Sequence, residues 1–265
     1  MIPLARIVHI SDVHFGRIRT SDIVSSLIDQ VNALNPTVVV VSGDITQRAR
    51  RVQLREAAEF ISSFQSPSMV IPGNHDVYAW WYAHYRLTKP LARYEKYISA
   101  DLSPVFETPE LRMVGINSSH GWTVKGGKFS KEDIAAAGSF FEHGASQQFK
   151  VLVVHHHLLS LDQLGKHDVA VRGNKLLDTA IRTKVRLVLC GHLHVSHVEE
   201  HKVNGQQIVI SSAGTATSDR GRHSNAAQNY FNIVDVHTNT FDITEMRFED
   251  SSRKYVDVRT SVFER

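Results

Sequence analysis

The sequence is poor in cysteine and in long apolar runs. It contains one cysteine, Cys190, so no intramolecular disulfide can form and no disulfide framework supports the fold. No apolar run approaches the roughly 20 residues that a membrane helix needs. The N-terminal stretch also lacks the apolar segment and small-residue cleavage site of a signal peptide. These absences predict a soluble, cytoplasmic protein with no transmembrane segment.

An excess of charge of one sign is also missing. The chain has 30 Lys and Arg against 27 Asp and Glu, a formal net charge of +3. This excess suits a small anionic substrate but is too weak to predict a stable nucleic-acid partner. The apolar fraction of 42% and the charged fraction of 22% exclude global disorder. We expect one domain over residues 1–265. The sequence leaves the oligomeric state open and is compatible with a dimer.

Short apolar runs rich in Val, Ile and Leu recur along the first two thirds of the chain and are typical of buried strands. The expected strands are 5–10, 37–42, 68–72, 111–117, 150–155 and 186–191. Helical spacing of apolar residues between several of them predicts helices over 20–36, 52–64 and 130–141. This alternation predicts an α/β layered fold with parallel strands. The last third alternates around Asn-Gly and Thr-Asn turns, which indicates antiparallel hairpins and a second sheet packed on the first.

Metal-competent side chains follow five of the expected strands. Ligands bind outside the carboxyl ends of strands in open α/β sheets, so we expect these side chains to meet at one edge. His and carboxylate ligands suit Mn, Fe or Zn, and the absence of a thiolate set argues against a closed structural zinc site. The residues are Asp12 and His14, then Asp44, then Asn74, His75 and Asp76, then His155, and finally His192 and His194.

These motifs, "DVH", "GD", "GNHD", "H" and "GHLH", resemble the signature of the calcineurin-like metallophosphoesterase superfamily. The segments "SGDITQRAR" and "SSAGTATS" resemble, more loosely, the bacterial class III cyclic-nucleotide phosphodiesterases. The superfamily resemblance implies a four-layer α/β/β/α sandwich with two mixed sheets and a metal site at the C-terminal ends of the strands. It also implies a hydrolase with a binuclear metal centre.

The resemblance assigns seven side chains to two divalent ions. Asp12, His14 and His194 would bind one metal; Asn74, His155 and His192 would bind the other, with Asp44 as the bridge. Seven ligands are too many for one ion. Spacing agrees, because residues two apart in an extended segment point the same way, so His192 and His194 can serve neighbouring ions. Two such ions could hold a bridging hydroxide that attacks a phosphodiester.

The remaining polar residues of the motifs have other expected roles. His75 is expected to stabilise the transition state or to protonate the leaving oxygen. Asp76 either fixes the tautomer of His75 or caps the following segment. His156 and His157 are expected in an exposed loop, although one of them could touch the substrate. Three further residues are not expected to bind metal. His9 and Cys190 are expected in the core, and His197 lies beyond the "GHLH" motif.

An aromatic segment follows the "GNHD" motif. Residues 77–97 contain five of the seven tyrosines and two of the three tryptophans. Two interpretations stay open: a helix that packs its aromatic side chains on the sheet, or a lid over 77–103 whose rings stack on a base or hold an acyl chain. In the second, Arg86, Lys89 and Arg93 would meet phosphate or an anionic membrane surface.

Three functional classes are compatible with these residues. The favoured one is a metal-dependent phosphodiesterase acting on a small phosphoester, with 3',5'-cyclic nucleotides as candidates. The second is a nuclease or a pyrophosphatase that cleaves nucleotide-linked lipid. The third is a non-enzymatic metal-binding scaffold, against which the intact His75 argues.

Overall fold

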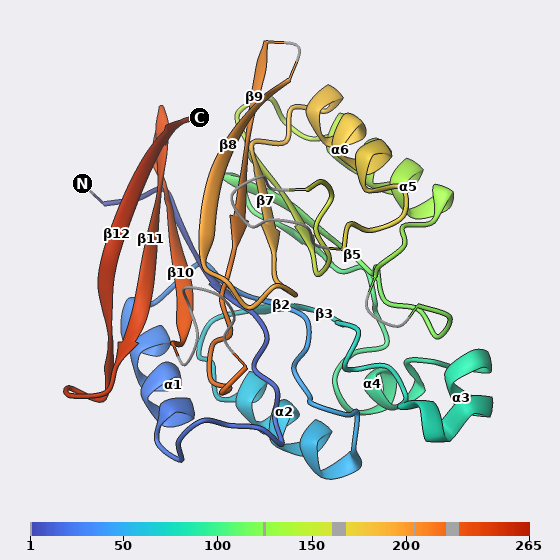
Figure 1. Ribbon diagram of the computed structural model, residues 1–265. Helices are drawn as coiled ribbons and strands as arrows, with labels where there is room; N and C mark the ends of the chain where they lie inside the picture. The colour runs from blue at the N-terminus through green and yellow to red at the C-terminus, as the bar shows by residue number, and fades with distance from the viewer. Residues whose placement is uncertain (1, 124–125, 161–167, 204, 221–227) are drawn as a thin grey trace.

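Two six-stranded sheets pack face to face, and helices cover the outer side of each (Figure 1). The computed structural model describes residues 2–265 except 124–125, 161–167, 204 and 221–227. The layers follow the order α/β/β/α, and both sheets mix parallel and antiparallel strands. The fold expected from the sequence is confirmed.

The first sheet has the strand order β12-β11-β10-β1-β2-β3. Its parallel strands are β1 (Ala5–Ile10), β2 (Val38–Ser42) and β3 (Ser68–Ile71). Its antiparallel strands are β10 (Tyr230–Val236), β11 (Thr240–Glu249) and β12 (Lys254–Glu264). Helices α1 (Ile23–Leu34) and α2 (Arg51–Ser62) lie on its outer face (Figure 1).

The second sheet has the strand order β4-β5-β6-β7-β9-β8. Its members are β4 (Val105–Glu107), β5 (Leu111–Ile116), β6 (Phe149–Val154), β7 (Leu187–Cys190), β8 (His197–Val203) and β9 (Gln206–Ser212). Helices α5 (Lys131–Glu142) and α6 (Gly173–Arg182) cover its outer face (Figure 1). The helical spacing in the sequence led us to α1, α2 and α5 but not to α6.

Three apolar layers hold these elements together. Strand side chains alternate between the two faces of a sheet. Ile7 of β1 therefore packs between the sheets with Val151 of β6, whereas Val8 packs against Leu27 of α1. A third layer joins the second sheet to α5 and α6. Because the central strands β2, β5 and β7 are buried on both faces, their sequences are almost continuously apolar.

The hairpins of the last third divide between the two sheets. β8 and β9 form one antiparallel hairpin and join the second sheet, where β9 pairs in parallel with β7. β10, β11 and β12 pair antiparallel and extend the first sheet beside β1. The expected hairpins are present, but they do not form a sheet of their own, because each adds to an edge of the parallel strands.

The aromatic segment forms three short helical pieces instead of one helix lying on the sheet. They are the 3₁₀ turn η1 (Trp80–Tyr82), α3 (Ala83–Thr88) and α4 (Ala92–Tyr97). Tyr78 and Tyr94 are buried, but Trp80, Trp81, Tyr82 and Tyr85 are exposed. The interpretation of a helix packing its aromatic side chains on the sheet is therefore wrong for most of them.

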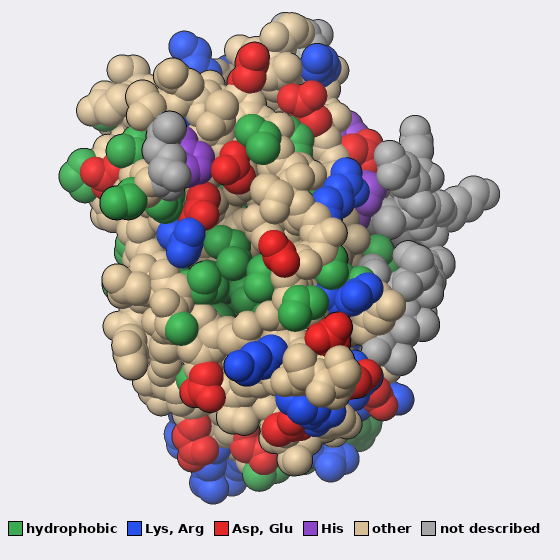
Figure 2. Space-filling view, turned by 90° about the vertical axis from the view of Figure 1, so that its left-hand side faces the viewer, with side chains coloured by type: hydrophobic (Ala, Val, Ile, Leu, Met, Phe, Trp, Pro, Cys, Tyr) green, Lys and Arg blue, Asp and Glu red, His purple; other side chains and the backbone are tan. Residues whose placement is uncertain are grey.

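Two further surface properties bear on partners. No helix among the described residues is both long and apolar enough to cross a bilayer. On the side of the molecule where β12 and the N-terminus lie, described Lys and Arg side chains alternate with Asp and Glu (Figure 2). This face therefore does not carry the broad basic surface that a nucleic-acid backbone requires.

Candidate metal centre

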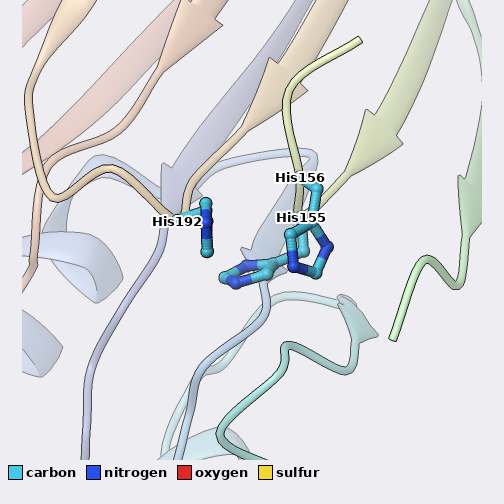
Figure 3. Close-up of side chains that lie close together, drawn as sticks. All are labelled: His155, His156 and His192. Atoms are coloured by element: carbon cyan, nitrogen blue, oxygen red, sulfur yellow. The ribbon is translucent and has the colours of Figure 1, made fainter. Parts of the chain in front are cut away.

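The side chains expected to bind metal converge where the parallel strands end. Asp12 and His14 follow β1, Asp44 follows β2 and Asn74 follows β3 in the first sheet. From the second sheet, His155 follows β6, and His192 and His194 follow β7. Donor atoms of Asp12, His14, Asp44 and His194 all lie within 4.8 Å of one another. Donor atoms of a second group, His155, His156 and His192, also lie within 4.8 Å of one another (Figure 3).

The first group surrounds one oxygen of Asp12. Nε2 of His194 lies 3.1 Å from Oδ1 of Asp12, and Nε2 of His14 lies 3.7 Å from the same oxygen. The other oxygen, Oδ2, accepts hydrogen bonds from the Ser11 hydroxyl and the His192 backbone N–H. These two donors orient the carboxylate so that Oδ1 faces the imidazoles.

Asp44 joins the two groups. Its Oδ2 lies 3.9 Å from Nε2 of His14, and its Oδ1 lies 3.4 Å from Nε2 of His155. In the second group, Oδ1 of Asn74 lies 3.3 Å from Nε2 of His155 and 3.0 Å from Nδ1 of His192. One carboxylate thus borders both sets of donors, as a bridging ligand would.

The hydrogen bonds around the site fit metal binding. Nδ1–H of His155 donates to the Ser42 carbonyl (2.8 Å), and Nδ1–H of His194 donates to the Arg220 carbonyl (2.7 Å). Each imidazole is thereby oriented with Nε2 toward the carboxylates, the arrangement in which outer partners orient metal-binding histidines. Oδ1 of Asp12 is buried and accepts no hydrogen bond from any described residue. A cation satisfies such a convergence of acceptors.

The protonation preferences of the site also favour positive charge at its centre. Burial lowers the pKa of His14 to about 4 and that of His192 to about 3, so both are neutral imidazoles with a lone pair to offer. Burial by itself also lowers the pKa of His155, but the Asp44 charge and hydrogen bond outweigh it and raise the pKa to about 9. Contacts with the surrounding histidines hold the pKa of Asp12 and Asp44 well below the ordinary value, although burial opposes this.

The backbone at the site is strained. Five of the seven expected ligands have positive φ: Asp12 (52°), His14 (56°), Asp44 (50°), His192 (73°) and His194 (58°). Such left-handed residues cost on the order of 1–3 kcal/mol each and cluster at functional sites. His192 and His194 do enter different donor groups, but the reason we expected is wrong. Their segment is a turn, not an extended strand, and the left-handed backbone directs each ring.

Two motif glycines allow the loops to approach this closely. A Cβ on Gly191 would lie 1.9 Å from the Ser11 hydroxyl oxygen and 2.6 Å from Oδ2 of Asp12. A Cβ on Gly73 would lie 2.2 Å from the Asp44 backbone nitrogen. Any side chain at either position would push a strand end away from its carboxylate, which accounts for glycine at both positions.

His75 lies beside the Asp12 group, with its ring centroid 4.9 Å from that of His14. Its backbone N–H donates to Oδ1 of Asp44 (2.7 Å), and its Nδ1–H donates to the Gln47 carbonyl (2.9 Å). This leaves Nε2 as the reactive nitrogen. Burial lowers the pKa of His75, against the opposing charge of Asp44, so the ring is neutral.

Asp76 has neither of the two roles expected from the sequence. Its carboxylate accepts the backbone N–H groups of Gly73, Ile45 and Thr46 and the Thr46 hydroxyl. The Gln47 carbonyl, not Asp76, holds the His75 ring, and the next helical piece begins only at Trp80. Asp76 therefore ties the loop after β3 to the loop after β2 and acts on the site through the backbone.

Arg220 is a site residue that sequence reasoning did not single out. Its Nη1 lies 3.0 Å from Nε2 of His75 and 3.2 Å from Oε1 of Gln47. Its carbonyl accepts the His194 hydrogen bond described above. The available signal was its position two residues after the segment "SSAGTATS", in the part of the chain that follows β9.

The other histidines divide as follows. His156 and His157 are buried, so the expectation of an exposed loop is wrong; His156 lies in the second donor group and His157 contacts Cys190. His9 is a buried core residue that contacts Ser42, and burial raises the pKa of the Cys190 thiol, as expected for a core cysteine. His197 pairs with Glu199, outside both groups.

The amino-acid sequence is similar to one protein family and to several characterised proteins. A family model described as calcineurin-like phosphoesterase matches residues 5–196. The glycerophosphodiester phosphodiesterase GpdQ of Enterobacter lignolyticus is 36% identical over 78 residues, 26% of this chain and 28% of the relative. The 3',5'-cyclic adenosine monophosphate phosphodiesterase CpdA of Escherichia coli K12 is 28% identical over 167 residues, 59% of this chain and 54% of the relative. The matches thus span about half or less of these relatives.

Solved structures agree on the fold. The crystal structure of a dimetal phosphatase from Danio rerio superposes with a TM-score of 0.69 at 13% identity. The superposition covers 99% of this chain and 99% of that one. At this identity the likeness concerns the arrangement of sheets and helices.

Proposed function

Because the chain belongs to the calcineurin-like phosphoesterase family, we propose that it is a binuclear-metal phosphodiesterase that hydrolyses a small phosphodiester. Two of its relatives are named for cleaving phosphodiesters, one of them a cyclic nucleotide. We take 3',5'-cyclic nucleotides as the first substrate class to test. Mn, Fe and Zn all suit the His and carboxylate donor set.

The position of Asp44 carries this proposal. A carboxylate with one oxygen near His14 and the other near His155 can join two cations, whereas a single-ion site has no use for the second donor group. Asp12, His14 and His194 would hold one ion; Asn74, His155 and His192 would hold the other. His156, the third member of the second group, has its ring centroid 4.5 Å from that of His192, and its Nδ1 lies 2.7 Å from the Ser118 hydroxyl oxygen.

The bound ions would supply Lewis acidity and lower the pKa of a coordinated water. The chain supplies the rest. Loops from both sheets hold the donors in fixed positions, so little reorganisation is needed when charge develops in the transition state. The buried carboxylates and neutral imidazoles leave a net positive centre once two divalent ions are present, which attracts a phosphate ester.

His75 and Arg220 form a pair at the rim of this centre. An Arg220 N–H donates to Nε2 of His75, so in the resting protein the Nε2 lone pair is directed at the guanidinium. When a phosphodiester binds, the guanidinium can donate instead to a phosphoryl oxygen. Nε2 of His75 could then accept a proton from the attacking water and pass it to the leaving oxygen.

Metal removal tests the proposal. Exhaustive chelation should abolish hydrolysis of bis(p-nitrophenyl) phosphate, and we expect Mn to restore it best among Mn, Fe and Zn. The reconstituted protein should then be assayed on cyclic AMP, a glycerophosphodiester, a nucleotide–lipid pyrophosphate and single-stranded DNA. Hydrolysis that survives complete chelation would contradict the metal mechanism, and turnover of DNA alone would indicate a nuclease.

Substitution of Arg220 tests the pair at the rim. Arg220→Ala should lower kcat/KM by about 10²-fold, because one donor to the transition-state charge is lost. Arg220→Lys should recover only part of the loss, since a lysine cannot donate two parallel hydrogen bonds. Both variants keep the backbone carbonyl that orients His194, so the metal content should not change.

Arg17 offers a matched control for Arg220. Its side chain lies in the same part of the surface, where it pairs with Asp219. Its backbone N–H donates to the His14 carbonyl (2.8 Å), a hydrogen bond that an alanine at this position keeps. Arg17→Ala should retain the activity of the unsubstituted protein. A loss of bound metal in Arg220→Ala would show that this residue supports the structure of the site instead of the reaction.

A further inference from the structure

All three tryptophans of the chain lie on one corner of the molecule and are exposed. Trp80, Trp81 and Trp122 have exposed fractions of 49%, 61% and 76%. Tryptophan is a residue that proteins bury to a high degree on average. We define the aromatic corner as these three residues with the exposed side chains of Tyr82, Tyr85 and Leu87.

Two contacts place Trp122 beside α3, although it is distant in sequence. A Cβ on Gly121 would lie 1.8 Å from the Arg86 carbonyl oxygen, so this chain segment packs directly on the helix. Nη2 of Arg86 donates to the Thr123 carbonyl (2.7 Å). The residue between Gly121 and Thr123 is therefore held at the same corner as η1 and α3.

Two of the exposed rings, those of Trp80 and Tyr82, are supported by arginine side chains that are themselves hydrogen-bonded to the backbone. The Arg86 guanidinium is buried, donates to the Tyr78 carbonyl and lies 4.1 Å from the centroid of the Trp80 ring. Arg93 lies 4.6 Å from the centroid of the Tyr82 ring and donates to the Ala49 carbonyl. Such cation–π contacts fix the rings outward, so little side-chain entropy remains to be lost on binding.

The charges around the aromatic corner are mainly positive. Residues 80–97 contain four Lys and Arg residues and one acidic residue, Glu95. Of the cations, Lys89 and Lys96 are exposed, and Arg48 is exposed next to Trp81, 5.8 Å from its ring centroid. Figure 1 shows that α3 projects at a corner, away from both sheets.

We propose that the aromatic corner docks on an anionic lipid bilayer. Tryptophan and tyrosine rings favour the boundary between headgroups and acyl chains, where an apolar body and a polar tip are both accommodated. Exposed Lys and Arg beside them attract anionic headgroups. A projecting corner reaches a flat bilayer without the complementary shape that a protein partner must provide.

Docking in this orientation would place the metal centre close to the lipid surface. Arg48, which contacts Trp81, follows directly after Gln47, whose carbonyl holds the His75 ring. The docking proposal does not depend on catalysis. Protein that lacks activity can still bind vesicles, and failure to bind would leave the proposed hydrolysis intact.

The tryptophans themselves provide the measurement. Because no tryptophan lies elsewhere in the chain, its fluorescence reports the aromatic corner alone. Adding vesicles of phosphatidylcholine and phosphatidylglycerol should shift the emission to the blue and protect it from acrylamide. The full-length protein should also co-sediment with these vesicles, less with pure phosphatidylcholine, and less at high salt.

One double variant and one control distinguish docking through the aromatic corner from nonspecific adsorption to vesicles. The double variant W80S/W81S should weaken co-sedimentation at least about tenfold, equivalent to about 1.4 kcal/mol. A matched control is Val262→Ser on β12, which removes an apolar side chain of similar exposure, 63%, at another part of the surface. It should bind vesicles as the unsubstituted protein does.

Three results would overturn the proposal. The first is the absence of both a blue shift and co-sedimentation with the anionic vesicles. The second is a blue-shifted emission that is already present without lipid in a dimer and is lost on dilution, which would assign the corner to a second copy of this chain. The third is quenching by a nucleotide without vesicle binding, which would assign the rings to base stacking.

Discussion

Replacement of Asp44 by asparagine should lower hydrolysis of bis(p-nitrophenyl) phosphate by at least about 10³-fold, the upper end of what one electrostatic contact with a transition state contributes. The variant should also bind fewer than two metal ions. The new amide would be nearly identical in shape to the carboxylate and could still accept the His75 backbone hydrogen bond, which reaches Oδ1. It would offer one oxygen and no negative charge to the two donor groups that Asp44 now joins.

The measurement combines metal analysis with turnover and thermal unfolding. Chelated Asp44→Asn protein should unfold within a few degrees of the chelated unsubstituted protein, because an amide of the same shape replaces the carboxylate. Asp235→Asn serves as the control, since Asp235 forms an ion pair with Arg6 far along the same sheet. Two bound ions and undiminished turnover in Asp44→Asn would show that Asp44 is not the bridge.

Replacement of His75 by alanine should lower turnover by about 10²–10⁴-fold, the contribution expected of a positioned acid or base. Both metal ions should remain, because the site holds His75 through the Gln47 carbonyl and Arg220, not through a donor group. The loss should be smaller for substrates whose leaving group is already a weak base, such as p-nitrophenolate. Comparison of that substrate with an alkyl phosphodiester therefore isolates the proton-transfer role.

His143→Ala is a suitable control for His75→Ala. His143 is an exposed histidine at the end of α5, and its Nδ1–H donates to the Ser139 carbonyl of the same helix. Equal losses on the two substrates would limit His75 to stabilising charge, and an unchanged rate on both would remove His75 from the mechanism.

The sequence motifs predicted which side chains would come together but not how each one is oriented. Each motif follows a strand whose apolar pattern is visible in the sequence, and parallel strands end at a common edge. Asp12 and Asp44 follow adjacent parallel strands of the first sheet and therefore had to approach one another. His155 follows a strand of the second sheet and meets them only because the two sheets pack face to face. The local reason for the orientation of His192 and His194 was missed, because left-handed backbone at non-glycine residues leaves no periodic trace in the sequence.

Contacts between loops escaped sequence reasoning for a different reason. Arg220 meets His75 across 145 positions of the chain, and Asp76 binds amides that precede it by about 30 positions. Such contacts depend on how two loops fold after their strands, which neither composition nor spacing encodes. The same holds for His156, which the sequence places in a loop and the structure buries among its neighbours.

The sequence by itself determined the layered fold and the family, and it predicted the seven residues that we propose bind metal, because apolar periodicity and strand-end motifs are local properties. Only the tertiary structure decided that Asp44 borders both donor groups, that Arg220 completes the rim and that the tryptophans face outward together. Those features arise where segments distant in the chain pack against one another. The packing depends on side chains from several segments, so no single motif contains them all.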